Sequence, residues 1–211
     1  MEKSVLTVTG EHESEKIIEK SRFLTFSAHV ESEEDARAFI ASVRAKHTLA
    51  THVCFAFVAD KIGNLMRFSD DGEPQGTAGM PILDVIKNKK LFETAVAVVR
   101  YFGGVKLGAG GLVRAYSSCA AENLAGAEIR SLEMCEEIQI TVSYTGVDGV
   151  QKYVAKSGAQ LLDCAYGESV GFKVAVKKRE AEAFKAGIAD YMQGRVELKT
   201  LGEYYGAFKT E

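Results

Sequence analysis

Apolar and polar residues change their spacing several times along the first half of the chain, and each change marks an expected element. Residues 16–30 carry Ile, Phe, Thr and Val in partial alternation, which predicts a strand. Residues 31–47 place apolar side chains at helical spacing behind an acidic start, with Ser32 at the N-cap position. Residues 52–60 and 65–70 are typical of two strands joined by a short turn, which predicts a hairpin.

The next segments predict a helix, a buried strand and a second helix. Residues 80–90 hold Pro81 in the expected first helical turn, where its missing N–H costs nothing. Residues 93–102 form a continuous apolar run, which favours a strand covered on both faces. Residues 112–126 show an apolar stripe at helical spacing and end at Gly126, a natural C-cap residue.

The pattern restarts near Glu136 and follows the order β-α-β-β-α-β, which is the ferredoxin-like order. Its elements are expected at residues 137–144, 147–158, 159–167, 169–179, 180–193 and 196–208. The chain is therefore expected to be an α+β protein of two domains, residues 1–133 and 134–211, although no linker rich in Pro or Gly separates them.

Composition and charge narrow the class of protein. The chain is 46% hydrophobic and 26% charged, as globular proteins are, and no segment reaches the roughly 18–20 apolar residues of a membrane span. Its start is too acidic for a signal peptide, and its four cysteines form no C-x-x-C pair, so we expect a cytoplasmic protein with reduced thiols. With a net charge of −3 the chain lacks the overall excess of basic residues that is typical of a nucleic-acid binder. The total charge does not exclude a local basic patch.

The segment RYFGGVKLGAGGLVR (residues 100–114) has the highest local density of glycine. It lacks the Lys and Ser/Thr of a phosphate-binding P-loop and the third glycine of a dinucleotide fingerprint, so neither class of nucleotide site is expected. A glycine-rich loop between a strand and a helix can still present backbone N–H groups to an anion. The candidate anion or nucleic-acid contacts are Arg100, Gly103, Gly104, Lys106, Gly108, Gly110, Gly111 and Arg114. Equally, the glycines can serve only tight turns and close helix–sheet packing.

A second polar cluster, SDDGEPQGTAG, occupies residues 69–79. Asp70, Asp71 and Glu73 could bind a hard cation or act in acid–base chemistry, but their spacing departs from a calcium loop. The turn-forming composition favours a solvated loop, with a role in recognition still open. His52 lies two residues before Cys54 on an expected strand and could join these carboxylates in a polar rim. No metal site is expected, because no second pair of ligands appears at suitable spacing.

A basic strand near the C-terminus is a further candidate contact. It carries Lys173, Lys177, Lys178 and Arg179. On a ferredoxin-like sheet such residues could contact a phosphate backbone, yet the aromatic signature of RNA-recognition motifs is absent. Lysines that protect an edge strand from aggregation explain the pattern equally well.

Taken together in order, the motifs closely resemble the YigZ/IMPACT family. The matching stretches are KSRF, ATHVCFAF, FSDDGEPQGTAGMPIL and VVRYFGGVKLGAGGLVRAY. The resemblance implies an N-terminal domain similar to the second domain of ribosomal protein S5, and a C-terminal domain similar to domain V of elongation factor G. Eukaryotic members of the family regulate translation by competing for a partner of a stress kinase. The resemblance supplies no catalytic residue and implies no cofactor.

The leading hypothesis is a non-enzymatic translation regulator that binds RNA, the ribosome or a translation-associated protein through the glycine-rich loop. A metal-dependent phosphate-ester or nucleotide hydrolase, using Asp70, Asp71 and Glu73, is the alternative from another class. A protein-interaction module without nucleic-acid binding is the third reading. We expect no membrane partner, and the sequence leaves the oligomeric state open.

Overall fold

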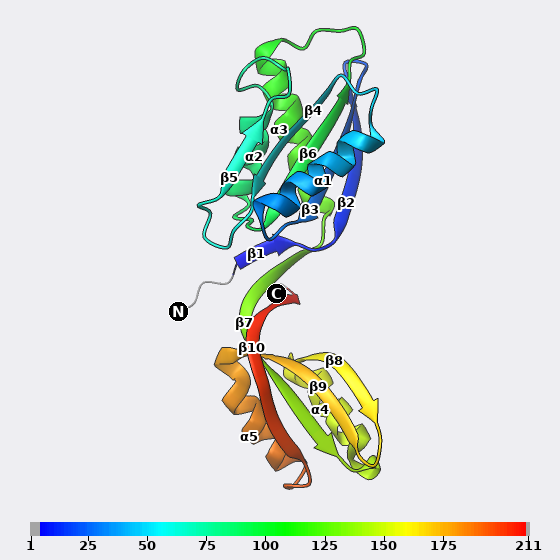
Figure 1. Cartoon of the computed structure of the whole chain (residues 1–211), viewed down its shortest axis with the longest axis vertical. Coiled ribbons are helices and arrows are strands. Elements are labelled where there is room, and N and C mark those ends of the chain that lie inside the picture. The colour runs from blue at the N-terminus through cyan, green and yellow to red at the C-terminus, as the bar shows by residue number, and fades with distance from the viewer. Residues whose placement is uncertain (1–4, 210–211) are drawn as a thin grey trace. The chain divides into compact units, whose positions relative to one another are not determined.

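The computed structural model describes residues 5–209, which divide into two compact units, residues 5–130 and 131–209 (Figure 1). The division falls inside strand β7 (Ile129–Val142), which explains why no linker is seen in the sequence. Residues 1–4 and 210–211, which the two expected domains include, lie outside the described residues. The described chain has mixed α and β structure with five α-helices.

The first unit is built on a five-stranded antiparallel sheet. Short β1 (Val5–Val8) precedes it, and the order within the sheet is β2-β3-β6-β4-β5. These strands are β2 (Glu11–Ile18), β3 (Ser21–His29), β6 (Thr94–Tyr101), β4 (His52–Val58) and β5 (Met66–Ser69). Central β6 is buried along nearly its whole length, as its continuous apolar run predicts.

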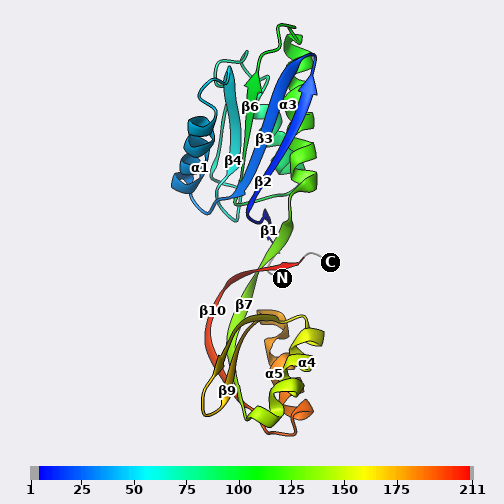
Figure 2. The same cartoon turned by 90° about the vertical axis from the view of Figure 1, so that its right-hand side faces the viewer.

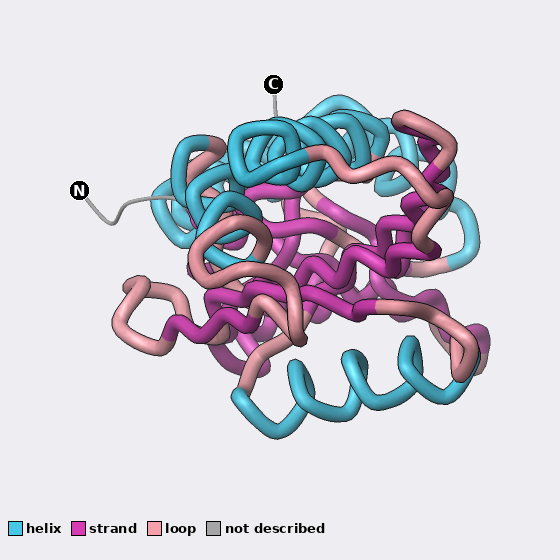
Figure 3. Tube along the Cα trace, turned by 90° about the horizontal axis from the view of Figure 1, so that it is seen from above, coloured by secondary structure: helices cyan, strands magenta, loops and turns pink. Residues whose placement is uncertain are grey.

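Helices cover both faces of this sheet (Figures 2 and 3). On one face α1 (Glu33–Lys46) packs through Ala36, Ile40 and Val43. On the other face α2 (Gly79–Asn88) and α3 (Gly108–Gly126) enclose the larger core. Successive residues of β6 point to opposite faces, so Val96 and Val98 join that larger core while Ala97 and Val99 pack towards α1.

Local signals explain which element boundaries the sequence predicts correctly. The hydroxyl of Ser32 accepts the Asp35 N–H, which confirms the N-cap of α1. The single strand expected at residues 16–30 is wrong, because Glu19 and Lys20 take positive φ values of 44° and 63° and turn the chain between β2 and β3. The C-cap expected at Gly126 is also wrong by one residue: the helix ends at Gly126 and Ala127 is its cap.

The second unit has the element order β-α-β-β-α-β. Its helices are α4 (Val147–Ser157) and α5 (Ala181–Tyr191), and its strands after β7 are β8 (Gln160–Tyr166), β9 (Val170–Lys177) and β10 (Glu197–Lys209). Short 3₁₀ turns, Tyr144–Gly146 and Lys178–Glu180, precede the two helices. The sheet runs β10-β7-β9-β8, and both helices pack on one core with its central strands. Because β9 pairs with β7 and with β8, the edge-strand explanation of its lysines is wrong.

Candidate functional site

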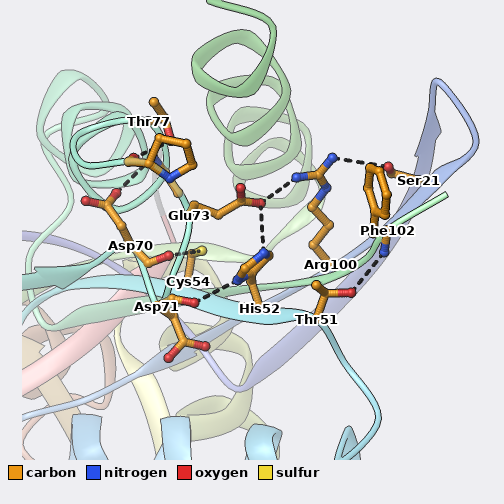
Figure 4. A network of polar contacts seen from close by, with 12 residues as sticks. Ser21, Thr51, His52, Cys54, Asp70, Asp71, Glu73, Thr77, Arg100 and Phe102 are labelled. Atoms are coloured by element: carbon orange, nitrogen blue, oxygen red, sulfur yellow. Dashed lines mark hydrogen bonds and ion pairs between the residues drawn. The ribbon is translucent and has the colours of Figure 1, made fainter. Parts of the chain in front are cut away.

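The two glycine-bearing segments of the first unit meet at one buried ion pair (Figure 4). Nη1 of Arg100, near the end of β6, lies 2.6 Å from Oε1 of Glu73 in the connection before α2. Arg100 is only 4% exposed and Glu73 8%. Because little water reaches either charge, each depends on the other for compensation. The expected solvated loop therefore sends one acidic side chain inward.

A chain of hydrogen bonds extends from this pair to the glycine-rich loop. The Tyr116 hydroxyl of α3 donates to Glu73 Oε1 at 2.8 Å, and burial raises the pKa of that hydroxyl, so it stays protonated. On the other side, Arg100 Nη2 and the backbone N–H of Gly103 donate to the Ser21 hydroxyl at 3.3 and 3.2 Å. The network thus connects α3, β6 and β3 to the start of the loop.

Aromatic rings enclose the Arg100 guanidinium. Its central carbon lies 5.4 Å from the ring centre of Phe23 and 5.5 Å from that of Phe102, which are distances typical of cation–π contacts. Phe23 on β3 and His52 on β4 are the cross-strand neighbours of Arg100. The sheet register therefore places Phe23, Arg100 and His52 in one row across the sheet.

His52 and Cys54 lie beside the ion pair with fixed orientations. His52 Nδ1 is 2.8 Å from the Asp71 carbonyl oxygen, so Nδ1 must donate, and Nε2 faces Glu73 Oε1 at 3.9 Å. The Cys54 thiol donates to the Asp70 carbonyl at 3.0 Å, and burial raises its pKa to about 12. A thiol so rarely ionised is not a nucleophile, as the packing role expected for Cys54 requires.

Asp70 and Asp71 use their carboxylates for local structure. Asp70 accepts the N–H groups of Gly76, Ala78 and Gly79 at 2.8–3.0 Å, and so caps α2. Burial alone would raise the pKa of Asp70, but these donors outweigh it and hold the pKa below its usual value. Asp71 pairs with Arg44 and accepts the Val53 N–H, both at 2.7 Å.

The three carboxylates therefore do not converge as a metal-dependent hydrolase requires. Only Glu73 points to His52 and Arg100, while Asp70 and Asp71 are held by α2 and α1. Within residues 5–209, no group of three His, Cys, Asp or Glu side chains could hold a metal ion. The hydrolase alternative thus lacks the geometry on which it depends.

A cavity of about 650 Å³ opens beside the glycine-rich loop and the first turns of α3. Lys106 and Arg114 contribute exposed cations, and Lys16 adds a third that pairs with Glu122 at 2.7 Å. The remaining lining is formed by Ile18, Glu19, Val105, Leu107, Gly111, Ala115 and Ser118. The first turn of α3 lacks a side-chain cap, so its N–H groups can be satisfied from outside the helix.

The glycines of the motif differ in their roles. Gly103 has no room for a Cβ, which would collide with the Lys20 carbonyl, so here glycine permits close packing. Gly104 and Gly108 adopt positive φ values of 86° and 69°. Gly110 and Gly111 lie inside α3, which starts four residues earlier than the sequence pattern predicts.

Two groups of basic residues that the sequence predicts as anion contacts are already engaged within the protein. Arg100 is buried and paired with Glu73, so it cannot serve as a surface cation. The basic strand of the second unit is largely neutralised by ion pairs. These pairs join Lys177 and Arg179 to Glu133 at 3.2 and 3.3 Å, and Lys178 to Glu203 at 2.7 Å. Lys173 lies opposite Gln139 and Asp163.

Four residues of the site cannot be assigned to it from the sequence. Ser21 lies within the KSRF motif and Tyr116 within the apolar stripe of α3, but nothing in either pattern indicates a contact with the glycine-rich loop. Lys16 joins the cavity wall only because β2 lies beside α3, and Phe102 covers Arg100 only because the chain turns there. These contacts depend on tertiary packing, which no local pattern records.

Comparison with known proteins gives consistent relatives over most of the chain. Residues 19–124 match the family model of the Impact N-terminal domain, and residues 140–195 match a domain of unknown function, DUF1949. The IMPACT family member YvyE of Bacillus subtilis (strain 168) is 36% identical over 196 residues, which cover 93% of this chain and 90% of that protein.

Two further relatives have similar coverage. The IMPACT family member YigZ of Escherichia coli (strain K12) is 35% identical over 188 residues, covering 88% of this chain and 92% of that protein. A crystal structure described as that of a hypothetical protein is 33% identical, with a TM-score of 0.62, and the match covers 96% of this chain and 99% of that one. Among the described residues, no helix has the length and apolar character needed to cross a membrane.

Proposed function

Because the chain belongs to the IMPACT family, we propose that it regulates translation by binding RNA, in a ribosome or another translation complex, through the cavity beside α3. The cationic wall of that cavity carries the proposal. Lys106 and Arg114 are exposed, and neither has an ion-pair partner among the described residues. Together with the uncapped first turn of α3 they offer several donors to a phosphate group.

The finer features of the fold support this reading. We propose that the first unit is similar to the second domain of ribosomal protein S5, and that the second unit is ferredoxin-like and similar to domain V of elongation factor G. The β-α-β-β-α-β order, with β7 and β9 in the middle of the sheet, supports the second assignment. The domains would then be residues 1–133 and 134–211 of a non-enzymatic, cytoplasmic protein without a cofactor.

Charge reversal tests the proposal. In the variant Lys106→Glu/Arg114→Glu, co-sedimentation with ribosomes and with purified RNA at low salt should fall strongly. Each lost contact to single-stranded phosphate should reduce the salt slope of the binding constant by about 0.7, hence by about 1.4 for both. The control Lys46→Glu/Lys87→Glu changes two exposed cations of the same unit that lie outside the cavity lining. Equal affinity and equal slope in both variants would refute RNA binding at this cavity.

A second candidate, binding to a translation-associated protein, rests on exposed apolar residues beside the loop. Phe102 is 48% exposed and Val113 37%. Affinity capture from a lysate of the source organism, with and without nuclease, separates the two functions. A partner that resists nuclease and is lost in Phe102→Ala would favour the protein-binding alternative. A partner that nuclease removes would favour RNA.

A further inference from the structure

A second cavity lies in the unit of residues 131–209, well apart in sequence from the residues of the proposed RNA site. Its volume is about 320 Å³, within the range of small-molecule pockets. Its walls come from the ends of β7, α4 and α5. They are formed by Ser143, Thr145, Gly146, Gly149, Tyr191, Met192 and Arg195.

The polar groups of this cavity suit an oxyanion. The Ser143 and Thr145 hydroxyls lie 3.0 Å apart and hydrogen-bond to each other, so one of their two protons remains free to donate to a ligand. Arg195 donates from Nη2 to Gln193 at 3.0 Å, and its Nη1 makes no hydrogen bond within the described residues. The lining holds one guanidinium and no carboxylate. Its charge therefore favours an anion, and a guanidinium with hydroxyls matches the geometry of a phosphoryl group.

The backbone around the cavity is shaped to bring these groups together. Gln193 and Gly194 both adopt positive φ values, 54° and 70°, so the chain reverses after α5 and returns Arg195 to the cavity. A Cβ at Gly149 would lie 2.9 Å from the Met192 sulfur, so glycine is needed for α4 to pack this closely. Tyr191 and Met192 add apolar surface to the cavity lining.

We propose that this cavity binds a small phosphorylated molecule. The phosphoryl group contacts Arg195, Ser143 and Thr145, and a flat apolar portion of the ligand lies against Tyr191 and Met192. A volume of about 320 Å³ accommodates one such molecule, not a folded polymer.

NMR titration of the full chain tests this inference with three probes: AMP, inorganic phosphate and adenosine. AMP should shift the backbone amide signals of residues 143–149 and 195. Phosphate should shift the same signals more weakly, because it lacks the ring, and adenosine should bind least. Absence of shifts at these amides with AMP, or shifts as large with adenosine as with AMP, would overturn the proposal.

Variants separate binding from a purely structural role. Arg195→Gln and Thr145→Val should each weaken AMP binding, at least about tenfold for Arg195→Gln, because a charged hydrogen bond is lost. Lys156→Gln, which removes an exposed cation at the far end of α4, should leave it unchanged. If Arg195 only supported the end of α5, its variant would lower the unfolding midpoint and Thr145→Val would bind AMP normally, which would refute the site. Lys106→Glu/Arg114→Glu should keep AMP binding, so this result is independent of the RNA proposal.

Discussion

The Glu73 carboxylate receives hydrogen bonds from Arg100 and Tyr116 where almost no water reaches it. A buried ion pair is costly to form, because both charges give up their hydration, and two hydrophobic residues could fill such a space as stably. The network here does something that hydrophobic residues could not: through Ser21 it holds the N–H of Gly103 in place. The network therefore serves to position the glycine-rich loop and does not add net stability.

Removing only one of the two charges should be strongly destabilising. Glu73→Gln keeps the shape of the side chain but leaves the Arg100 guanidinium buried without a counter-charge. We expect a loss of about 3–5 kcal/mol in the free energy of unfolding, measured by urea denaturation.

The matched control is Glu122→Gln, which breaks the partly exposed pair with Lys16 and should have a much smaller effect. Similar losses in the two variants would show that the Glu73–Arg100 pair is screened by water and does not fix the loop.

At the scale of elements, the sequence predicts those boundaries whose signals are local. Ser32 before an amphipathic run predicts the start of α1, and the apolar run of β6 predicts a strand covered on both faces. The sequence does not predict the early start of α3, because glycine is a poor helix former and the pattern therefore indicates a loop at Gly108, Gly110 and Gly111. Gly103, shortly before this helix, packs against the turn at Lys20, and no local pattern records that contact.

The site is only partly predictable for the same reason. Arg100 continues the alternation of Val96 and Val98, so a strand buried on both faces already implies a buried guanidinium that needs a partner. That partner is Glu73, 27 residues earlier, and neither its inward orientation nor the outward role of Asp71 has a signature in the loop sequence. Turn composition alone treats the three carboxylates as equivalent.

The start of α2 gives a prediction at this scale. Its N-cap residue, Ala78, has no capping side chain, and Asp70 supplies the acceptor instead. Asp70→Asn should therefore cost about 1–2 kcal/mol at neutral pH, because asparagine keeps one acceptor oxygen but loses the second oxygen and the charge that strengthen these hydrogen bonds. The folded-state pKa of Asp70 lies below its usual 3.8, so its contribution is present above pH 3.8 and is lost as the pH falls through the folded-state pKa.

Urea unfolding of the wild type and of Asp70→Asn, from neutral pH into this acidic range, measures the contribution of Asp70 to stability. The difference in stability between the wild type and Asp70→Asn should be constant at neutral pH, narrow as the pH falls below about 3.8, and close once the pH is below the folded-state pKa. Asp84→Asn, an exposed carboxylate on the same helix, is the control and should show no such gap. A gap that persists at low pH would mean that Asp70 acts through packing and not through its charge.

For the molecule as a whole, a net charge of −3 is compatible with a cationic wall at one cavity, because charges can cluster locally. An acidic protein gains little from nonspecific attraction to RNA, so under the function we propose the affinity for RNA must come from a few contacts at Lys106 and Arg114. Binding should accordingly be weak and local, and it should depend on salt according to the number of those contacts.

Each of the two units has its own hydrophobic core, and this determines how the molecule should respond to local damage. The core of residues 5–130 includes Val98 and Tyr116, and that of residues 131–209 includes Phe172. Separate cores open separately when neither unit depends on the other for its buried area. Glu73→Gln should therefore accelerate amide hydrogen exchange in β6 and α2 and leave β9 and α5 unchanged.

The reciprocal variant completes the test. Phe172→Ala removes a fully buried ring from the second core, at a cost of about 3–5 kcal/mol, and should accelerate exchange in β9 and α5 alone. Mass spectrometry of peptic fragments resolves the two units. If either variant accelerated exchange equally in both, the chain would open as one cooperative body, and separate cores would not mean separate stabilities. The proposed RNA site and the second cavity would then have to be tested as one thermodynamic system, because a change at either would alter the stability of the other.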